Sequence, residues 1–194
     1  IQTLALTPSV DYIHDMQQLP DGKVLAVGAV NDNFAVMRFN ADMTLDTTFG
    51  DGGGKRLDFG AGVHARSFAI DSTGRIIVVG GNRIARLTAD GALDTTFSGD
   101  GWATDDYVVH CHSITIEADG NYLVAGRDNE HFRLSRWSSA GARTKTYNKD
   151  VFTIGNWNSS SYLDRDYARS VISKDDGDIL VLGVSGGRIN NDEL

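Results

Sequence analysis

The stretch Asp71-Ser72-Thr73-Gly74-Arg75-Ile76-Ile77-Val78-Val79-Gly80 joins a polar turn to four consecutive apolar residues and ends in glycine. The same pattern occurs at residues 19–28, 117–126 and 174–183. The turn glycines are spaced by 52, 46 and 57 residues, at Gly22, Gly74, Gly120 and Gly177. A recurring period of about 40–50 residues indicates a tandem-repeat architecture in which each repeat is one supersecondary unit.

Each repeat is predicted to begin with a β-hairpin and to continue with two further strands. The turn glycine supplies the positive φ of a tight hairpin turn. The second strand is apolar on consecutive residues, so both faces of its sheet must be covered. The sequence therefore predicts an all-β protein, a β-propeller of four-stranded antiparallel blades. Third strands with their turns are expected at residues 37–49, 85–97 and 135–147, and fourth strands near 54–59, 101–106 and 149–154.

The repeats predict a single domain over residues 1–194, with about three complete blades and a partial fourth. A strand at 2–7 stands where the last strand of a blade would stand. The partial blade could be completed in three ways. Residues 188–190 could join it together with the strand at 2–7, a second chain could supply the missing strands, or the chain could belong to a longer propeller with further blades. We favour the last two, because an unpaired blade edge invites another chain. The blades are expected at approximately 12–59, 65–106 and 111–154, and the partial blade at 167–184.

Two copies of the third turn carry a specific resemblance. Leu45-Asp46-Thr47-Thr48-Phe49-Gly50 and Leu93-Asp94-Thr95-Thr96-Phe97, together with Asp21-Gly22-Lys23, resemble the delta-60 repeat. This resemblance implies a bacterial propeller within a large extracellular or surface protein, and it brings no catalytic residue set with it. The third unit departs from the pattern, because Arg143-Thr144-Lys145-Thr146-Tyr147 stands there instead.

Composition narrows the classes of partner. The net charge of −8 opposes binding to phosphate backbones or anionic lipid, so we expect no nucleic acid partner. The single cysteine, Cys111, cannot form an internal disulfide, and no cysteine and histidine set has the spacing of a zinc site. No apolar stretch approaches the roughly 20 residues that cross a bilayer, so we expect no membrane insertion. No cofactor is predicted.

Alignment of the four first strands predicts a ring of side chains at the mouth of the central channel. Such a ring could hold a carboxylate, a sulfated or uronic sugar, or a metal ion. Alternatively, it lines a solvated channel and pairs internally with the residues that follow, Asp15, Ser67, Ser113 and Ser170. A metal site would use His110 and His112, for which no third ligand is evident. The ring positions are Tyr12, His64, His110 and Tyr167, and two residues later His14, Arg66, His112 and Arg169.

The longest insertion, residues 155–166, is expected on the same face as this ring. Its Trp157 and Tyr162 could stack on a sugar ring or a partner surface, since loops carry function more often than strands do. The alternative is that they cover blade edges.

These patterns favour a non-enzymatic recognition or scaffold module of a secreted or surface protein, which binds a glycan or a protein through the loop face at the channel mouth. The alternative is an architectural segment of a fibre, phage appendage or surface layer that self-associates through open blade edges. An enzyme of the lactonase or esterase kind is less favoured, because it would need metal-binding carboxylates and amides at the axis. No nucleophile elbow, paired acids or Ser/His/Asp set is visible.

Overall fold

A computed structural model describes residues 11–128, 131–147, 167–174 and 178–184, and every regular element in these ranges is a β-strand. Sheet 1 contains β1 (Tyr12–Gln18), β2 (Val24–Val30), β3 (Asn33–Phe39) and β4 (Gly54–Leu57). Sheet 2 contains β5 (Ser67–Ile70), β6 (Ile76–Gly80), β7 (Arg83–Leu87) and β8 (Trp102–Thr104). Sheet 3 contains β9 (His110–Ile116), β10 (Tyr122–Arg127), β11 (Phe132–Trp137) and β12 (Arg143–Tyr147). Sheet 4 contains β13 (Tyr167–Ser173) and β14 (Ile179–Val184).

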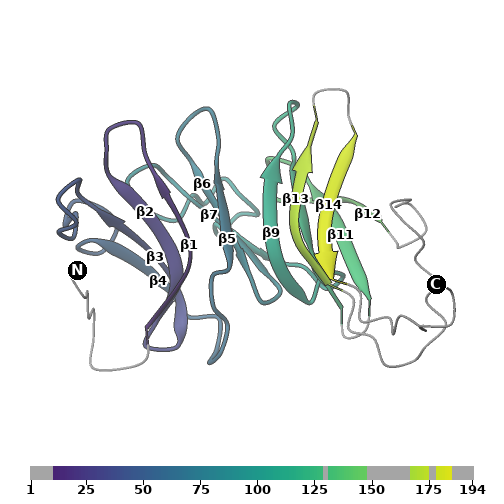
Figure 1. Ribbon diagram of the computed structural model, residues 1–194, viewed down its shortest axis with the longest axis horizontal. Helices are drawn as coiled ribbons and strands as arrows, with labels where there is room; N and C mark the ends of the chain where they lie inside the picture. Colours follow the sequence, from purple (N-terminus) through teal and green to yellow (C-terminus); the bar gives the residue numbers. More distant parts are fainter. Residues whose placement is uncertain (1–10, 129–130, 148–166, 175–177, 185–194) are drawn as a thin grey trace, which may run out of the picture.

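Each sheet is an antiparallel meander in which sequence neighbours pair. The sheets stand side by side in chain order, from the purple sheet 1 to the yellow sheet 4 (Figure 1). Their first strands lie along one side of the array, with β1 against β5, β5 against β9, and β9 against β13. We call these four the inner strands. The predicted all-β class and the four-stranded antiparallel sheets are confirmed.

The apolar second strands are buried on both faces, as their composition predicts. Val78 of β6 packs into a cluster shared with sheet 1, whereas Ile77 and Val79 pack into a cluster shared with sheet 3. All three side chains are fully buried. Burial of such a side chain contributes about 1.5–3 kcal/mol. The consecutive apolar residues therefore hold the sheets together in both directions along the array.

The repeated Leu-Asp-Thr-Thr-Phe turn forms a clamp between neighbouring sheets at the rim. In sheet 2, Arg86 donates from Nε to Asp94 over 2.8 Å and lies over the ring of Phe97. Arg86 also donates to the backbone oxygen of Ser139 in sheet 3. Arg38 of sheet 1 repeats the arrangement, with Asp46, Phe49 and the Ala89 oxygen of sheet 2 as its partners.

The outer strand of sheet 3 differs from the expectation. A fourth strand was expected near 149–154, but residues 148–166 lie outside the described part. The strand that pairs with β11 is β12, Arg143–Tyr147, and it consists of the residues at which the sequence departs from the repeat. With the Leu-Asp-Thr-Thr-Phe turn missing, Arg136 pairs with Glu117 and Asp119 of its own sheet.

The outer strands of sheets 1 and 2 lie close to where they were expected, at Gly54–Leu57 and Trp102–Thr104. The predicted strand at 2–7 and the segment 188–190 lie outside the described residues. In the part of the chain that the structure covers, no helix could cross a bilayer.

Candidate functional site

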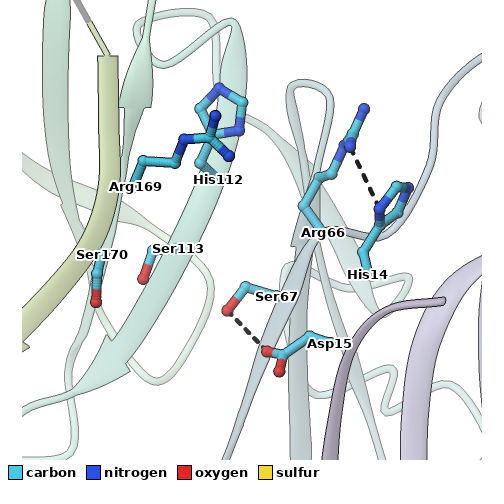
Figure 2. Close-up of a pocket in the computed structure, with 8 residues that line it drawn as sticks. All are labelled: His14, Asp15, Arg66, Ser67, His112, Ser113, Arg169 and Ser170. Carbon is cyan, nitrogen blue, oxygen red and sulfur yellow. Dashed lines mark hydrogen bonds between the residues drawn. The ribbon is translucent and has the colours of Figure 1, made fainter. Parts of the chain in front are cut away.

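The inner strands meet at a pocket of about 370 Å³, to which each sheet contributes two consecutive residues (Figure 2). We call the first residue of each pair the upper row and the second the lower row. The structure thus brings together four of the residues that alignment of the repeats predicted for the ring. The upper row is His14, Arg66, His112 and Arg169, and the lower row is Asp15, Ser67, Ser113 and Ser170.

Each upper-row residue sits in a local irregularity of its inner strand. The register between β1 and β2 skips His14, and those of β9 with β10 and β13 with β14 skip His112 and Arg169. In sheet 2, Arg66 donates its amide to Val79 just before β5 begins. An extra residue in one strand re-aims its side chain. In sheets 1, 3 and 4 a bulge therefore turns one polar side chain towards the pocket, and in sheet 2 Arg66 lines the pocket from the position just before β5.

In sheets 1 to 3, a glycine near the end of the second strand makes this close approach of the inner strand sterically feasible. A Cβ atom on Gly80 would lie 1.9 Å from the His64 carbonyl oxygen. Gly28 and Gly126 face the equivalent carbonyls at 1.8 and 2.0 Å. These separations are far below van der Waals contact, so no other residue fits without moving the inner strand. The sequence pattern contained these glycines, but their role as the seat of a bulge was not predicted.

The lower row links neighbouring inner strands. Asp15 accepts hydrogen bonds from the Ser67 hydroxyl at 3.2 Å and from the Phe68 amide at 3.4 Å, across the junction between sheets 1 and 2. Ser113 accepts one from the Val171 amide at 3.2 Å, at the equivalent position between sheets 3 and 4. These hydrogen bonds join neighbouring inner strands at two junctions, and they fix the floor of the pocket.

The upper row carries positive charge at neutral pH. The guanidinium of Arg66 contacts Nδ1 of His14 at 3.4 Å, and that of Arg169 lies beside His112 (Figure 2). Within the described residues, no carboxylate forms an ion pair with Arg66. The upper row thus contributes two guanidinium groups to a pocket whose lower row includes the carboxylate of Asp15, in a chain whose net charge is −8.

The histidines of the pocket are neutral at pH 7. Burial, together with the charge of Arg66 and the proximity of His64, lowers the pKa of His14. The pKa of His112 falls to about 4, because burial and several surrounding cations disfavour the imidazolium. The groups that act on His112 are Arg66, Arg127, Arg169 and His110. The arginines therefore supply the charge, and the imidazoles supply uncharged hydrogen-bonding groups.

Tyr12, His64 and His110 lie outside the pocket lining. Tyr12 stacks on His14 and His64 with ring centroids 6.1 and 5.9 Å apart. His64 forms a 2.7 Å contact between Nε2 and the carboxylate of Asp32. Asp32 was not predicted, although its place in a loop on the same face could have suggested it. His110 and Tyr167 begin β9 and β13.

Other candidates do not join this site. Trp157 and Tyr162 lie outside the described residues. His110 and His112 are neighbours on β9, but no group of three potential metal ligands occurs in the described ranges. Burial raises the pKa of the Cys111 thiol well above its usual value, so it is protonated at neutral pH.

The repeats of sheets 1 and 2 match a known family. Residues 19–49 and 72–97 match the model of a β-propeller domain of unknown function, DUF5122. These repeats are of the β-propeller type. The matched segments contain the apolar second and third strands and the rim clamp, so the β-propeller repeat predicted from the sequence is confirmed at this level. No curated protein matches the chain.

Two solved structures share the fold of this chain. A protein of unknown function from Bacteroides caccae has a TM-score of 0.52 at 14% identity, over 88% of this chain and 53% of its own. The extracellular domain of a protein described as a one-component system from B. thetaiotaomicron has a TM-score of 0.51 at 12% identity, over 90% and 21%. The chain therefore spans about half of the first structure and about a fifth of the second. At these identities the likeness concerns the fold.

Proposed function

We propose that the chain is a non-enzymatic recognition module of an extracellular or surface protein, built from delta-60-type repeats, and that its upper row binds an anionic ligand. The favoured ligand is a glycan that carries carboxylate or sulfate groups. A single observation carries this proposal: Arg66 and Arg169, from sheets far apart in the sequence, line one pocket together with two neutral imidazoles. An acidic side chain of a protein partner offers the same chemistry and is the second candidate.

The chemistry of the upper row suits a planar or tetrahedral anion. A guanidinium presents several N–H donors in a fixed fork, which matches carboxylate and sulfate oxygens. His14 and His112 lie next to these forks, and a neutral imidazole carries one donor and one acceptor nitrogen. The pocket volume of about 370 Å³ lies in the range of small-ligand sites, which is roughly 300–1,000 Å³.

The floor of the pocket supports binding rather than hydrolysis. A propeller hydrolase of the lactonase kind needs several carboxylates free to hold a metal ion or to activate water. Among the described residues, the lining contains one carboxylate, that of Asp15, which accepts hydrogen bonds from sheet 2. Its role in joining inner strands argues against a role as a base.

The extracellular placement rests on two similarities. The delta-60 resemblance implies a surface protein, and one of the structures with the same fold is an extracellular domain. Cell-surface and secreted modules meet acidic glycans, which fits a cationic pocket on an otherwise acidic chain.

Calorimetric titration with matched oligosaccharides tests the proposal. We expect a sulfated or uronic oligosaccharide to bind and a neutral oligosaccharide of equal length not to bind. Arg66→Gln and Arg169→Gln should each weaken binding by about tenfold or more, because a hydrogen bond to a charged group is worth about 1.5–3 kcal/mol. Arg56→Gln, an exposed change on β4 with the same loss of charge, should leave the affinity unchanged.

Two outcomes contradict this function. Equal binding of the neutral oligosaccharide would show that charge is not recognised. Equal losses in Arg56→Gln and Arg66→Gln would show that the anion responds to net charge rather than to the pocket.

The affinity for a sulfated ligand should rise several-fold between about pH 7.5 and pH 5.5. In the unliganded pocket the pKa of His112 is about 4, so its imidazole is neutral over this range, and the pKa of His14 is lowered from its usual value by burial and by Arg66. A bound anion offsets the arginine charges and raises both pKa values, so binding takes up protons and strengthens as the pH falls. Sulfate keeps its charge throughout, which leaves the protein as the titrating partner. His112→Gln should flatten the profile, and an unchanged profile in this variant would contradict the assignment.

A further inference from the structure

A further cationic group lies outside the pocket, at the junction between sheets 1 and 2. Arg83 begins β7 and stands two residues before Ala85, which is fully buried in the core that these two sheets share. Alternate residues of a strand face the same side of the sheet, so Arg83 projects into the same junction. Its guanidinium lies over the rings of Phe59 and Trp102, 5.5 and 5.1 Å from their centroids. These two aromatic contacts hold the cation in one position.

The fold holds this cation without an acidic partner. Nη1 of Arg83 donates to the hydroxyl of Thr104, whereas Nε is buried and has no hydrogen-bond acceptor among the described residues. In the described ranges the guanidinium of Arg83 forms no ion pair, although Arg86 of the same strand is paired with Asp94. The turn of residues 81–82, between β6 and β7, is glycine and asparagine and offers no carboxylate. The charge of Arg83 is therefore fixed in place but not balanced by a described contact.

Sheet 3 shows what such a stacked arginine binds. Arg83 and Arg133 are equivalent, because each is the cross-strand partner of the glycine near the end of the second strand of its sheet. Arg133 lies over the ring of Tyr107, 5.1 Å from its centroid. It forms an ion pair at 2.5 Å with Asp128, which belongs to the longer loop between β10 and β11. In sheet 3 the protein itself thus supplies a carboxylate to the stacked guanidinium, and the described part of sheet 2 does not.

We propose that Arg83, together with the hydroxyl of Thr104, binds a carboxylate group of a ligand, and that Asp128 is the internal counterpart of this group in sheet 3. A guanidinium presents paired N–H donors that match the two oxygens of a carboxylate. The Thr104 hydroxyl accepts one N–H of Arg83 and keeps its own hydrogen to donate. A uronate sugar and an acidic side chain of a protein partner both carry this group. The site lies outside the pocket lining, so the proposal does not depend on the upper row.

Nuclear magnetic resonance of the arginine side chains tests the site in the full chain. Each Nε–H group gives its own nitrogen–proton correlation signal, and that of Arg83 is assigned through its backbone resonances. Titration with sodium acetate, at an ionic strength held constant with sodium chloride, should shift the Arg83 signal in a saturable manner. The Arg133 signal should stay in place, because Asp128 already occupies its donors. The Arg66 signal reports on the pocket separately.

Asp128→Asn provides the matched variant. It removes the internal carboxylate and keeps the size of the side chain, so the Arg133 signal should acquire an acetate response of the same direction as that of Arg83. Arg83→Gln should abolish the acetate-dependent shifts of the backbone amides around Phe59 and Trp102. The proposal is overturned if acetate moves the Arg83 signal no more than chloride does, or if Arg133 of the native chain responds as strongly as Arg83.

A second pair of titrations distinguishes the two sources of the carboxylate. The probes are glucuronate and an aspartate that is acetylated at its nitrogen and amidated at its main-chain carboxyl. Tighter binding of glucuronate at Arg83 assigns the site to a sugar, and tighter binding of the blocked aspartate assigns it to an acidic side chain; either result supports the site. An Arg83 signal that responds to neither probe overturns it. A missing response of Arg66 alone counts against the proposed pocket function and leaves the Arg83 result intact.

Discussion

Replacing Asp105 with alanine should lower the free energy of unfolding by about 3–5 kcal/mol, which is the usual cost of breaking a buried charged network. Asp105 is fully buried where β8 ends. It accepts hydrogen bonds from the Trp137 indole at 3.1 Å and from Arg143 at 2.9 Å, and also from the Ser135 hydroxyl. Two backbone amides, those of Tyr107 and Val108, complete its set of donors.

The cost arises because alanine would leave several donors buried without an acceptor. Each buried donor that lacks an acceptor costs about 1–3 kcal/mol of folding free energy. Urea denaturation followed by tryptophan fluorescence measures the change. Asp58→Ala provides the matched control, because Asp58 is exposed in the corresponding loop of sheet 1 and accepts one amide, that of Gly60. We expect the control to lose less than about 1 kcal/mol. Similar losses in both variants would contradict the network.

Gly80→Ala should destabilise the fold by about 3 kcal/mol, because a clash with rigid backbone lies at the upper end of the usual cost of overpacking, which is about 1–3 kcal/mol. The new methyl group would lie 1.9 Å from the His64 carbonyl oxygen and 2.9 Å from the Ala65 Cα. Relief of this clash requires β5 to move away from β6, which also displaces Arg66. The variant should therefore lose ligand affinity together with stability.

Gly60→Ala separates the clash from the conformational preference of glycine. Gly60 has a φ of +97° and no atoms within 4 Å of its would-be Cβ. Its replacement should therefore cost about 1–2 kcal/mol, from backbone conformation alone. Thermal unfolding of the two variants side by side gives the comparison. If Gly60→Ala were as costly as Gly80→Ala, the close approach of the inner strand would not be the cause.

Much of the fold could be predicted because every repeat carries the same two constraints, a turn glycine and an apolar second strand. The turn glycines set the hairpins, and the apolar second strands required cover on both faces. Alignment of the inner strands then placed His14, Arg66, His112 and Arg169 at equivalent heights, and the structure brings them to one pocket. Positions that are equivalent in tandem units become neighbours around an axis, so register alone was sufficient for this prediction.

Other features could not be predicted because they depend on contacts between units. The close approach of the inner strand depends on the contact between the His64 carbonyl and Gly80, which the sequence alone does not reveal. Asp105 occupies a strand end where an acidic residue looks like ordinary turn chemistry, yet tertiary packing buries it. The outer strand of sheet 3 formed where the turn motif was lost, since Arg143 joins the network of Asp105 instead.

The glycine and the bulge together make a socket whose walls are main chain. Backbone atoms determine how closely the inner strand approaches the glycine, and the identity of the bulged side chain does not. The residue that projects from each socket can therefore change while the fold is kept. Two arginines and two histidines occupy the sockets of this chain. A different quartet would give the same framework another ligand preference, so recognition and architecture can diversify independently in such a protein.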